Sequence, residues 1–412
     1  MVHFKTLKNG IRLVVKQMEG LMSVSMGVLV GTGACFESDA EDGISHFIEH
    51  MMFKGTKNRT AFAISDEMDR IGAQTNAFTG KDLTCYYAKS TTENAEKAFE
   101  ILADFFLNSI FPEDEMVREK GVVIEEISMN EDTPDDLCLD MLSEAYYGNE
   151  GYGRNILGPR ANVNGFTRAD VDKYMAARYT TDNIVISMAG NIDINLAEEL
   201  AEKYFGGLKA TKADERKVAV HLQHKSVVKY KDIEQVHFAV AFPSVKRYDR
   251  LFDATVLMNS VLGGSMSSRL FQTVREKLGL AYTVYSYTTA YADSGMLIVY
   301  AGVNAENYQK SVDAVRKCIE DIKKKDITRE EFIRGKEQLK ASSIFAQEST
   351  SSQMLLYGKE LLYSGRLYDF EKRIAEVNAV SMDDINEAID FNFNLNSAAA
   401  AVVGKLDNPL NI

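Results

Sequence analysis

The feature that most constrains the fold is a repetition within the chain. Residues 183–193 (NIVISMAGNID) resemble residues 396–407 (NSAAAAVVGKLD), and each segment is typical of a buried strand leaving a helix. The beginnings of the two halves also agree, because the alternating run at 24–30 precedes a helical segment, as the run at 236–242 precedes a helix at 253–262. We interpret the match as an internal duplication, which predicts two related domains.

The length of 412 residues agrees with two domains, since single hydrophobic cores usually stop growing well below this size. Residues 208–225 are polar and charged without clear helical periodicity, which is typical of a connection. We therefore predict an N-terminal domain at 1–212, a linker at 213–227 and a C-terminal domain at 228–412.

Strand and helix patterns are mixed along the first half, which favours an α+β fold. Alternation predicts strands within 4–16, 24–30 and 75–88, and helical spacing predicts helices at 43–53, 61–71, 94–108 and 112–130.

Composition narrows the class of protein. Hydrophobic residues make up 45% and charged residues 26% of the chain, which is typical of a soluble globular protein. The net charge of −13 would repel a phosphate backbone, so we expect no nucleic-acid partner. An acidic surface favours a cationic ligand or serves only solubility, and the charge alone does not decide between them.

The chain shows no signal-peptide pattern at its start and no apolar run of roughly 18 residues, so we expect a cytoplasmic protein without a membrane span. The four cysteines have no CxxC spacing, which argues against a disulfide framework and a thiolate zinc site. We expect reduced, buried or nearly buried thiols at Cys35, Cys85, Cys138 and Cys318.

The segment His46-Phe-Ile-Glu49-His50 lies in a region of helical periodicity. Offsets of three and four residues share one helix face, so two imidazoles and one carboxylate point the same way. The imidazoles can occupy two positions of a tetrahedral zinc, while the carboxylate reaches the metal's water. Surface histidines are the alternative, but a chance HxxEH in a chain with six histidines is an event on the order of one in a hundred.

A catalytic zinc needs a third protein ligand. Glu125 and Glu126 are neighbours on a predicted helix, about 100° apart, so only one can face a given metal. Glu119 precedes Glu126 by two helical turns and shares its face, which favours Glu126 as ligand and Glu119 as a supporting carboxylate. A solvated helix face is the alternative for any one of these glutamates.

HFIEH at 46–50, followed by REKGVVIEEISMNEDTPDD at 118–136, resembles the pitrilysin/insulinase family of inverted-motif zinc peptidases. The likeness is greatest to its processing-peptidase branch, the bacterial relatives of the mitochondrial processing peptidase β subunit, and runs from residue 5 to about 407. The resemblance implies one Zn²⁺ per chain held by His46, His50 and Glu126, with Glu49 as the general base and Glu119 in support.

The resemblance also implies a fold and an assembly. The family fold is an α/β sandwich repeated twice, and members of this length pair face to face around a closed chamber. We therefore expect two homologous α/β-sandwich domains, a homodimer, and hydrolysis of unfolded peptides or extended protein termini.

Further matches imply substrate-binding and catalytic residues outside the zinc motif. Asn76, Ala77, Phe78 and Thr79 resemble the edge strand that pairs with substrate backbone. Arg275 and Tyr282, which follow a Gly-Gly-Ser segment, resemble a pair of donors to the scissile carbonyl or its oxyanion.

Asp136 and Asp140 stand where processing peptidases carry acids that hold an arginine just before the cleaved bond. The alternative is that both are surface acids at a helix start, where the helix dipole favours them. For the chain as a whole, the alternative is a non-catalytic binding or assembly subunit of the same fold, against which the intact zinc motif argues. A small-molecule lyase is disfavoured by the duplicated length.

Overall fold

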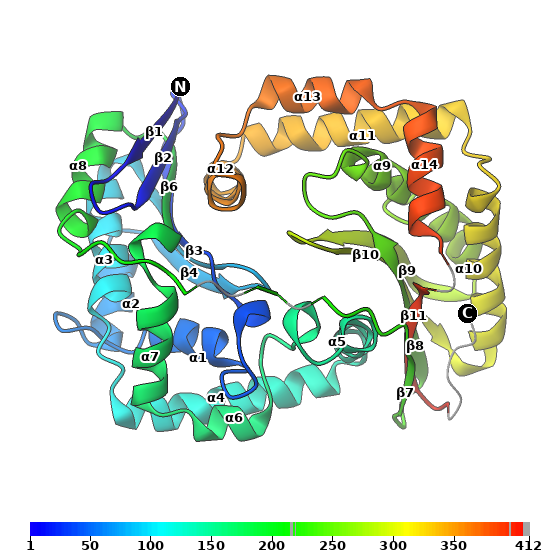
Figure 1. Ribbon diagram of the computed structural model, residues 1–412, viewed down its shortest axis with the longest axis horizontal. Helices are drawn as coiled ribbons and strands as arrows, with labels where there is room; N and C mark the ends of the chain where they lie inside the picture. The colour runs from blue at the N-terminus through cyan, green and yellow to red at the C-terminus, as the bar shows by residue number, and fades with distance from the viewer. Residues whose placement is uncertain (215–216, 219, 395–396, 407–412) are drawn as a thin grey trace. The chain divides into compact units, whose positions relative to one another are not determined.

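A computed structural model describes residues 1–214, 217–218, 220–394 and 397–406 (Figure 1). The chain forms two compact units, and neither is continuous in sequence. The first comprises residues 1–127, 155–218 and 344–369, and the second comprises residues 128–154, 219–343 and 370–412.

The first unit is built on a six-stranded sheet. In spatial order, its strands are β1 (Val2–Thr6), β2 (Arg12–Gln17), β6 (Ile184–Gly190), β3 (Ser23–Val30), β5 (Thr84–Thr91) and β4 (Gln74–Thr79). The β2–β6 pair is parallel and the other neighbours are antiparallel. In this arrangement β4 is an edge strand, paired only with β5 among the described strands.

Helices pack on both faces of this sheet, which explains why β6 is buried along its whole length. The helices of the first unit are α1 (Ile44–Met51), α2 (Ala61–Arg70), α3 (Ala95–Asn108), most of α4 (Glu113–Asp132), α6 (Arg160–Gly165), α7 (Arg168–Arg178), α8 (Ile194–Phe205) and α12 (Thr350–Ser364). Alternate strand residues point to the two faces. Val28 and Ile186 join the core that includes α1, α3 and α8, whereas Leu29 and Val185 pack with α12.

Helix α12 comes from far along the chain, and small residues let it lie close to the sheet. Gly358 faces Leu29 and Ser187 so closely that an added Cβ would lie 2.8 Å from the leucine side chain. The hydroxyl of Ser187 donates to the carbonyl oxygen of Met354 at 2.7 Å. This helix therefore covers the face of the first sheet that carries Leu29 and Val185.

The second unit repeats the same strand order without a counterpart of β1. Its five-stranded sheet runs β7 (Ser226–Tyr230), β11 (Ala399–Gly404), β8 (Gln235–Ser244), β10 (Gly295–Asn304) and β9 (Ala281–Ala290). The first pair is parallel and the others are antiparallel, as in the first sheet from β2 to β4. This shared topology supports the predicted duplication, and two homologous mixed α/β halves are the observed fold.

The second sheet is also covered by a helix from the other half of the sequence. Its helices are α5 (Pro134–Tyr147), α9 (Phe252–Leu262), α10 (Tyr308–Lys323), most of α11 (Arg329–Gln347), α13 (Phe370–Ala379) and α14 (Met382–Asn392). Helix α5 packs on β11 and β8, where alanines leave room for it. The thiol of Cys138 donates to the carbonyl oxygen of Ala401 at 3.5 Å.

The elements follow the sequence patterns with one clear correction. The strand predicted within residues 75–88 is a hairpin, because residues 80–83 form the turn between β4 and β5. The predicted domains are continuous ranges. In the structure, α5 belongs to the second unit although it lies in the predicted N-terminal domain, and α12 belongs to the first unit although it lies in the predicted C-terminal domain. Positions 215, 216 and 219 of that linker lie outside the described residues.

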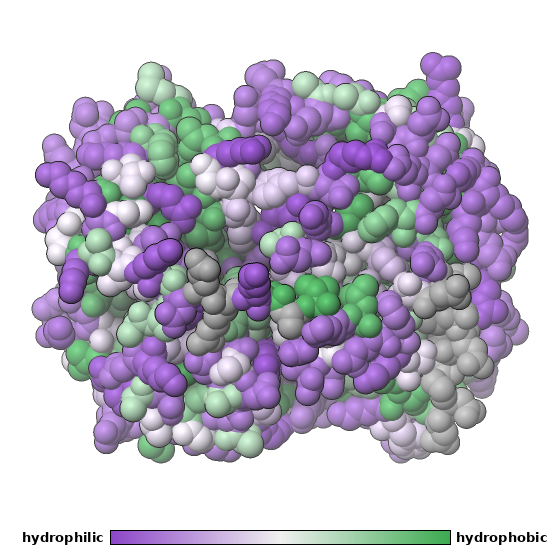
Figure 2. Space-filling model, viewed as in Figure 1, coloured by the Kyte–Doolittle hydropathy of each residue, from purple (hydrophilic) through white to green (hydrophobic). Residues whose placement is uncertain are grey.

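All four cysteines are free and buried, as predicted. In the described part of the chain, no helix is long and apolar enough to cross a membrane. Hydrophilic residues dominate the face in Figure 2, where hydrophobic residues lie in small groups among them. This agrees with a content of charged residues of 26%, which is typical of a globular protein.

Candidate metal centre

Helix α1 buries one side in the core and leaves the other for polar groups. Ile44, Phe47, Ile48 and Met51 are fully buried, so the intervening positions carry the predicted chemistry. The rings of His46 and His50, one turn apart, have centroids separated by 4.5 Å. The helix thus presents two imidazoles side by side.

Helix α4 brings a carboxylate to these imidazoles. One oxygen of Glu126, Oε2, lies 3.6 Å from Nε2 of His46 and 3.4 Å from Nε2 of His50. Zinc bonds of roughly 2.0–2.1 Å in a tetrahedron place neighbouring ligand atoms about 3.3 Å apart. The neighbouring Glu125 is exposed on another side of α4. Among the described residues, His46, His50 and Glu126 form the group that could hold a metal ion.

The charge states of the two histidines differ in the absence of metal. Burial, with help from the neighbouring His50, lowers the pKa of His46 to about 4, so this imidazole is neutral and has a lone pair for a metal. For His50 the effect of burial is outweighed by hydrogen bonds with Glu119 and Glu126, which raise its pKa to about 9. Metal binding at this centre therefore requires His50 to release a proton.

Two groups hold Glu119 behind His50. Its Oε1 lies 2.9 Å from Nδ1 of His50, and its Oε2 lies 2.7 Å from the ammonium of Lys54. Glu119 is only 4% exposed, and these partners outweigh burial and lower its pKa. When Nδ1 of His50 carries the proton, Nε2 is left with its lone pair toward Glu126. The arrangement fits a zinc ligand with a carboxylate partner.

Glu49 lies on the same helix and is not part of the three-residue group. Its Oε2 accepts a hydrogen bond of 2.5 Å from the hydroxyl of Thr79, which is at the end of β4. Burial raises the pKa of Glu49, and the Thr79 hydroxyl partly offsets this. A carboxylate with a raised pKa beside a metal-type cluster is suited to accept and return a proton.

Sequence reasoning missed the residue that caps α1. Both oxygens of buried Glu37 accept backbone N–H groups at the start of the helix, from Gly43 and Ser45, each at 2.8 Å. The hydroxyl of Ser45 lies 2.8 Å from that of Tyr174, which ties the same turn to α7. An acid that precedes the helix by several residues gave no usual capping spacing, so the sequence offered little signal.

The predicted substrate strand is the edge strand β4. Asn76, Ala77, Phe78 and Thr79 lie in it, and β4 contacts α1. Its unpaired edge is suited to backbone hydrogen bonds with an extended chain. The contact of Thr79 with Glu49 shows that this strand reaches the candidate centre, while its role in substrate binding stays a prediction.

The other predicted site residues lie in the second unit. Arg275 is on the π-helical segment Phe271–Lys277, and its guanidinium carbon lies 5.0 Å from the ring centroid of Tyr282 on β9. Tyr282 is 76% exposed. Asp136 and Asp140 lie on α5, and burial, with Asp135, raises the pKa of Asp136. The roles predicted for these four residues stay predictions.

Comparisons with known proteins agree with this geometry. The model of the insulinase family (peptidase family M16) matches residues 12–160, and that of the peptidase M16 inactive domain matches residues 165–339. The chain is 42% identical to an uncharacterized zinc protease of Bacillus subtilis, over 94% of each chain. It is 35% identical to an uncharacterized zinc protease of Rickettsia felis, over 97% of each.

Solved structures share the fold. A protease from Helicobacter pylori has a TM-score of 0.91 at 24% identity, with 98% of this chain and 99% of that chain covered. A peptidase M16 inactive domain from Pseudomonas fluorescens has a TM-score of 0.90 at 20% identity, with both chains covered completely. With its two matched family domains and its close full-length relatives, this chain belongs to the insulinase family, peptidase family M16.

Proposed function

We propose that the protein is a zinc-dependent endopeptidase that hydrolyses unfolded peptides or extended protein termini. One observation carries the proposal: Nε2 of His46 and of His50 converge on one oxygen of Glu126 at separations close to those of zinc ligands. The names of its relatives as zinc proteases support the same metal. One such group per chain predicts one zinc ion per chain.

When bound, zinc would polarise water and the scissile carbonyl as a Lewis acid. Glu49 would take the proton of the attacking water and pass it to the leaving amine nitrogen. The hydroxyl of Thr79 would hold the Glu49 carboxylate between these transfers. Because water is the nucleophile, no covalent enzyme intermediate is needed.

Substrate binding is proposed to rest on strand addition. An extended peptide would pair with the free edge of β4 over Asn76–Thr79, and main-chain pairing tolerates many sequences. Arg275 and Tyr282 would donate to the substrate carbonyl as negative charge develops on it. The contact between their side chains supports a joint role.

A preference for a basic residue on the amino-terminal side of the cut is the finer proposal. Asp136 and Asp140 share one face of α5, and an arginine fork between two carboxylates makes charge-assisted hydrogen bonds. Matched peptides with Arg or Ala at that position test this, with wild type and the Asp136→Asn/Asp140→Asn variant. Equal cleavage of both peptides by wild type would refute the preference.

We also propose a homodimer, because a single chain carries both the metal-type cluster and the Arg275–Tyr282 pair. Two identical chains could then form a complete enzyme without a paralogue. Light scattering of the purified protein measures this directly. A monomer at working concentration with full peptidase activity would contradict the proposal.

The decisive experiment for catalysis is Glu49→Gln. The variant should retain about one zinc per chain, because Glu49 is not a ligand, while turnover of a peptide falls by roughly 10²–10⁴-fold through loss of the base. Metal analysis and peptide hydrolysis on the same preparation separate the two effects. Near-normal turnover would exclude this mechanism, and a zinc-loaded wild type that cleaves no peptide in a broad library would favour the non-catalytic binding subunit.

A further inference from the structure

We propose that Lys54 is a positioning residue of the metal centre, which acts on His50 through Glu119. The inference rests on the proposed zinc function and adds a residue that the HxxEH motif does not contain. Lys54 lies three residues after the end of α1, the helix that carries His46 and His50, on the loop of residues 52–60 that leads into α2. Its ammonium is 2.7 Å from Oε2 of Glu119.

The two oxygens of Glu119 have different partners. Oε1 faces Nδ1 of His50 at 2.9 Å, while Oε2 faces Lys54. The Glu119 side chain is 6% exposed, so little water is present to replace a lost partner. By holding one oxygen, Lys54 limits rotation of the carboxylate and keeps the other directed at the histidine. His50 in turn keeps Nε2 directed at the metal position.

The loop that carries Lys54 is itself anchored to the body of the first unit. The hydroxyl of Ser109 donates to the carbonyl oxygen of Met52 at 3.0 Å, and the backbone N–H of Lys57 donates to the carbonyl oxygen of Asn108 at 3.0 Å. These contacts fix both sides of Lys54 in the chain. Its ammonium is thus delivered from a loop whose backbone is bound to residues 108–109.

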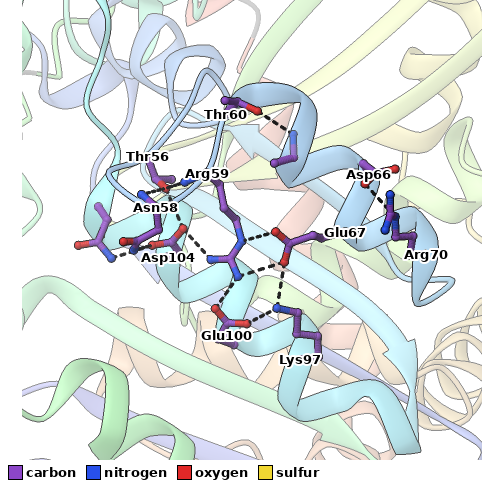
Figure 3. Close-up of polar contacts among 12 residues, drawn as sticks. Thr56, Asn58, Arg59, Thr60, Asp66, Glu67, Arg70, Lys97, Glu100 and Asp104 are labelled. Atoms are coloured by element: carbon purple, nitrogen blue, oxygen red, sulfur yellow. Dashed lines mark hydrogen bonds and ion pairs between the residues drawn. The ribbon is translucent and has the colours of Figure 1, made fainter.

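A partly buried charge network fixes the far end of the same loop (Figure 3). The guanidinium of Arg59 binds Glu67 through two nitrogens at 3.1 Å each, Glu100 at 2.6 Å and Asp104 at 2.8 Å. Asp104 also accepts from the hydroxyl of Thr56 at 2.8 Å. Because α3 carries Glu100 and Asp104, the network binds the loop to that helix. The loop that carries Lys54 is therefore held at its far end as well.

Loss of the positive charge of Lys54 and loss of its contact with Glu119 should change the affinity for zinc in opposite directions. Removal of a cation close to the centre would by charge alone favour a dication such as Zn²⁺. Loss of a group that orients a ligand's partner instead weakens metal binding, typically by about 10–100-fold for the partner itself. Our proposal therefore predicts weaker zinc binding when the ammonium is removed, which charge alone does not.

The experiment compares Lys54→Met with Lys57→Met, an exposed lysine on the same loop. The full chain is stripped of metal, and its zinc dissociation constant is measured against a competing chelator, without any peptide substrate. We expect about a tenfold weaker constant for Lys54→Met and no change for Lys57→Met. Lys54→Arg should restore most of the affinity, and circular dichroism melting of the metal-free variants checks that each is folded.

A double-mutant cycle tests the route through Glu119. In the Glu119→Gln background, Lys54→Met should cause no further loss, since its partner is already neutral. Unchanged or tighter zinc binding by Lys54→Met, or a full additional loss in that background, would overturn the inference. A wild-type chain that binds no zinc would instead overturn the proposed function, which makes the two failures distinguishable.

Discussion

From β2 to β4 the first sheet has the same strand order as the second, yet the helices that follow the equivalent strands β3 and β8 carry different residues. After β3, α1 presents His46 and His50 on its polar side. After β8, α9 is buried on most sides. The hydroxyl of Ser286 on β9 donates a hydrogen bond of 2.6 Å to Oδ1 of Asn259 in this helix. The same scaffold thus serves a candidate metal centre in one copy and packing in the other.

The comparison teaches that the fold places a site without specifying its chemistry. In α9, Leu257, Met258 and Leu262 fill the core with apolar volume, and Asn259 satisfies its hydrogen bonds inside the unit. Among the described residues of the second unit, no group of histidines and acids converges as in the first. This agrees with the inactive-domain family model that matches much of the second half.

The largest effect is expected from the carboxylate that completes the first copy. Glu126→Gln should weaken zinc binding by more than the roughly 100-fold that loss of a supporting partner can cost, because a direct ligand is lost. Glu125→Gln is the matched control at the preceding, exposed position of α4. Metal analysis after dialysis measures both, and a zinc-free Glu125→Gln beside a zinc-loaded Glu126→Gln would reverse our assignment.

A second effect tests how closely the exchanged helix must approach the first sheet. Gly358→Val would place side-chain atoms against Leu29 and Ser187, and we expect a loss of about 2–3 kcal/mol in the free energy of unfolding. Gly365→Ala, at the end of α12, meets nothing within 4 Å and loses only the ease of a left-handed φ of 69°. That change should cost about 1 kcal/mol.

Urea unfolding followed by circular dichroism compares these two glycine variants. Equal midpoints for Gly358→Val and Gly365→Ala would mean that α12 tolerates displacement from the sheet, against the close packing described above.

A third, smaller effect tests whether α9 contributes to stability alone and not to zinc binding. Asn259→Ala removes both hydrogen bonds with Ser286 and leaves buried groups unpaired, which should cost about 1–2 kcal/mol of stability. Zinc content should stay at the wild-type value, because the second copy provides no ligand. Thermal melting and metal analysis give the two readings, and a loss of zinc without a loss of stability would contradict the division of roles.

The last effect concerns pH and the cap of α1. Burial raises the pKa of Glu37 from 4.5 to about 8, so the folded protein holds a proton that the unfolded chain releases earlier. This contribution to stability is complete below pH 4.5 and is lost as pH rises through about 8. Glu37→Gln cannot ionise, and its stability should fall less over that range. Parallel slopes for the two proteins would show that Glu37 is already ionised when folded.

The parts of the site that could be predicted are those that depend on local spacing. His46, Glu49 and His50 share a face by helical periodicity, and the choice of Glu126 over Glu125 followed from the position of Glu119 on the same helix. The contacts of Thr79 and Lys54 could not be predicted, because they join side chains through tertiary packing that no spacing encodes. Glu37 was missed for the same reason.

The limits for the fold are similar. Alternation identified the strands around β3 and β8, but the short turn at residues 80–83 did not interrupt it enough to separate β4 from β5. The sequence patterns also do not say which sheet α5 and α12 each cover. That choice depends on small residues such as Gly358 and Ala401, which become informative only when their neighbours are known.

The exchange of α12 has a consequence for the newborn chain on the ribosome. Strand β6 ends at Gly190, whereas the helix that covers its outer face begins at Thr350. At roughly 5–20 residues per second, the intervening segment takes about 10–30 s to synthesise. For that time, Leu29, Val185 and their neighbours lack the apolar side chains of α12 that cover them in the finished fold, so the first unit cannot complete its core until that helix has been made.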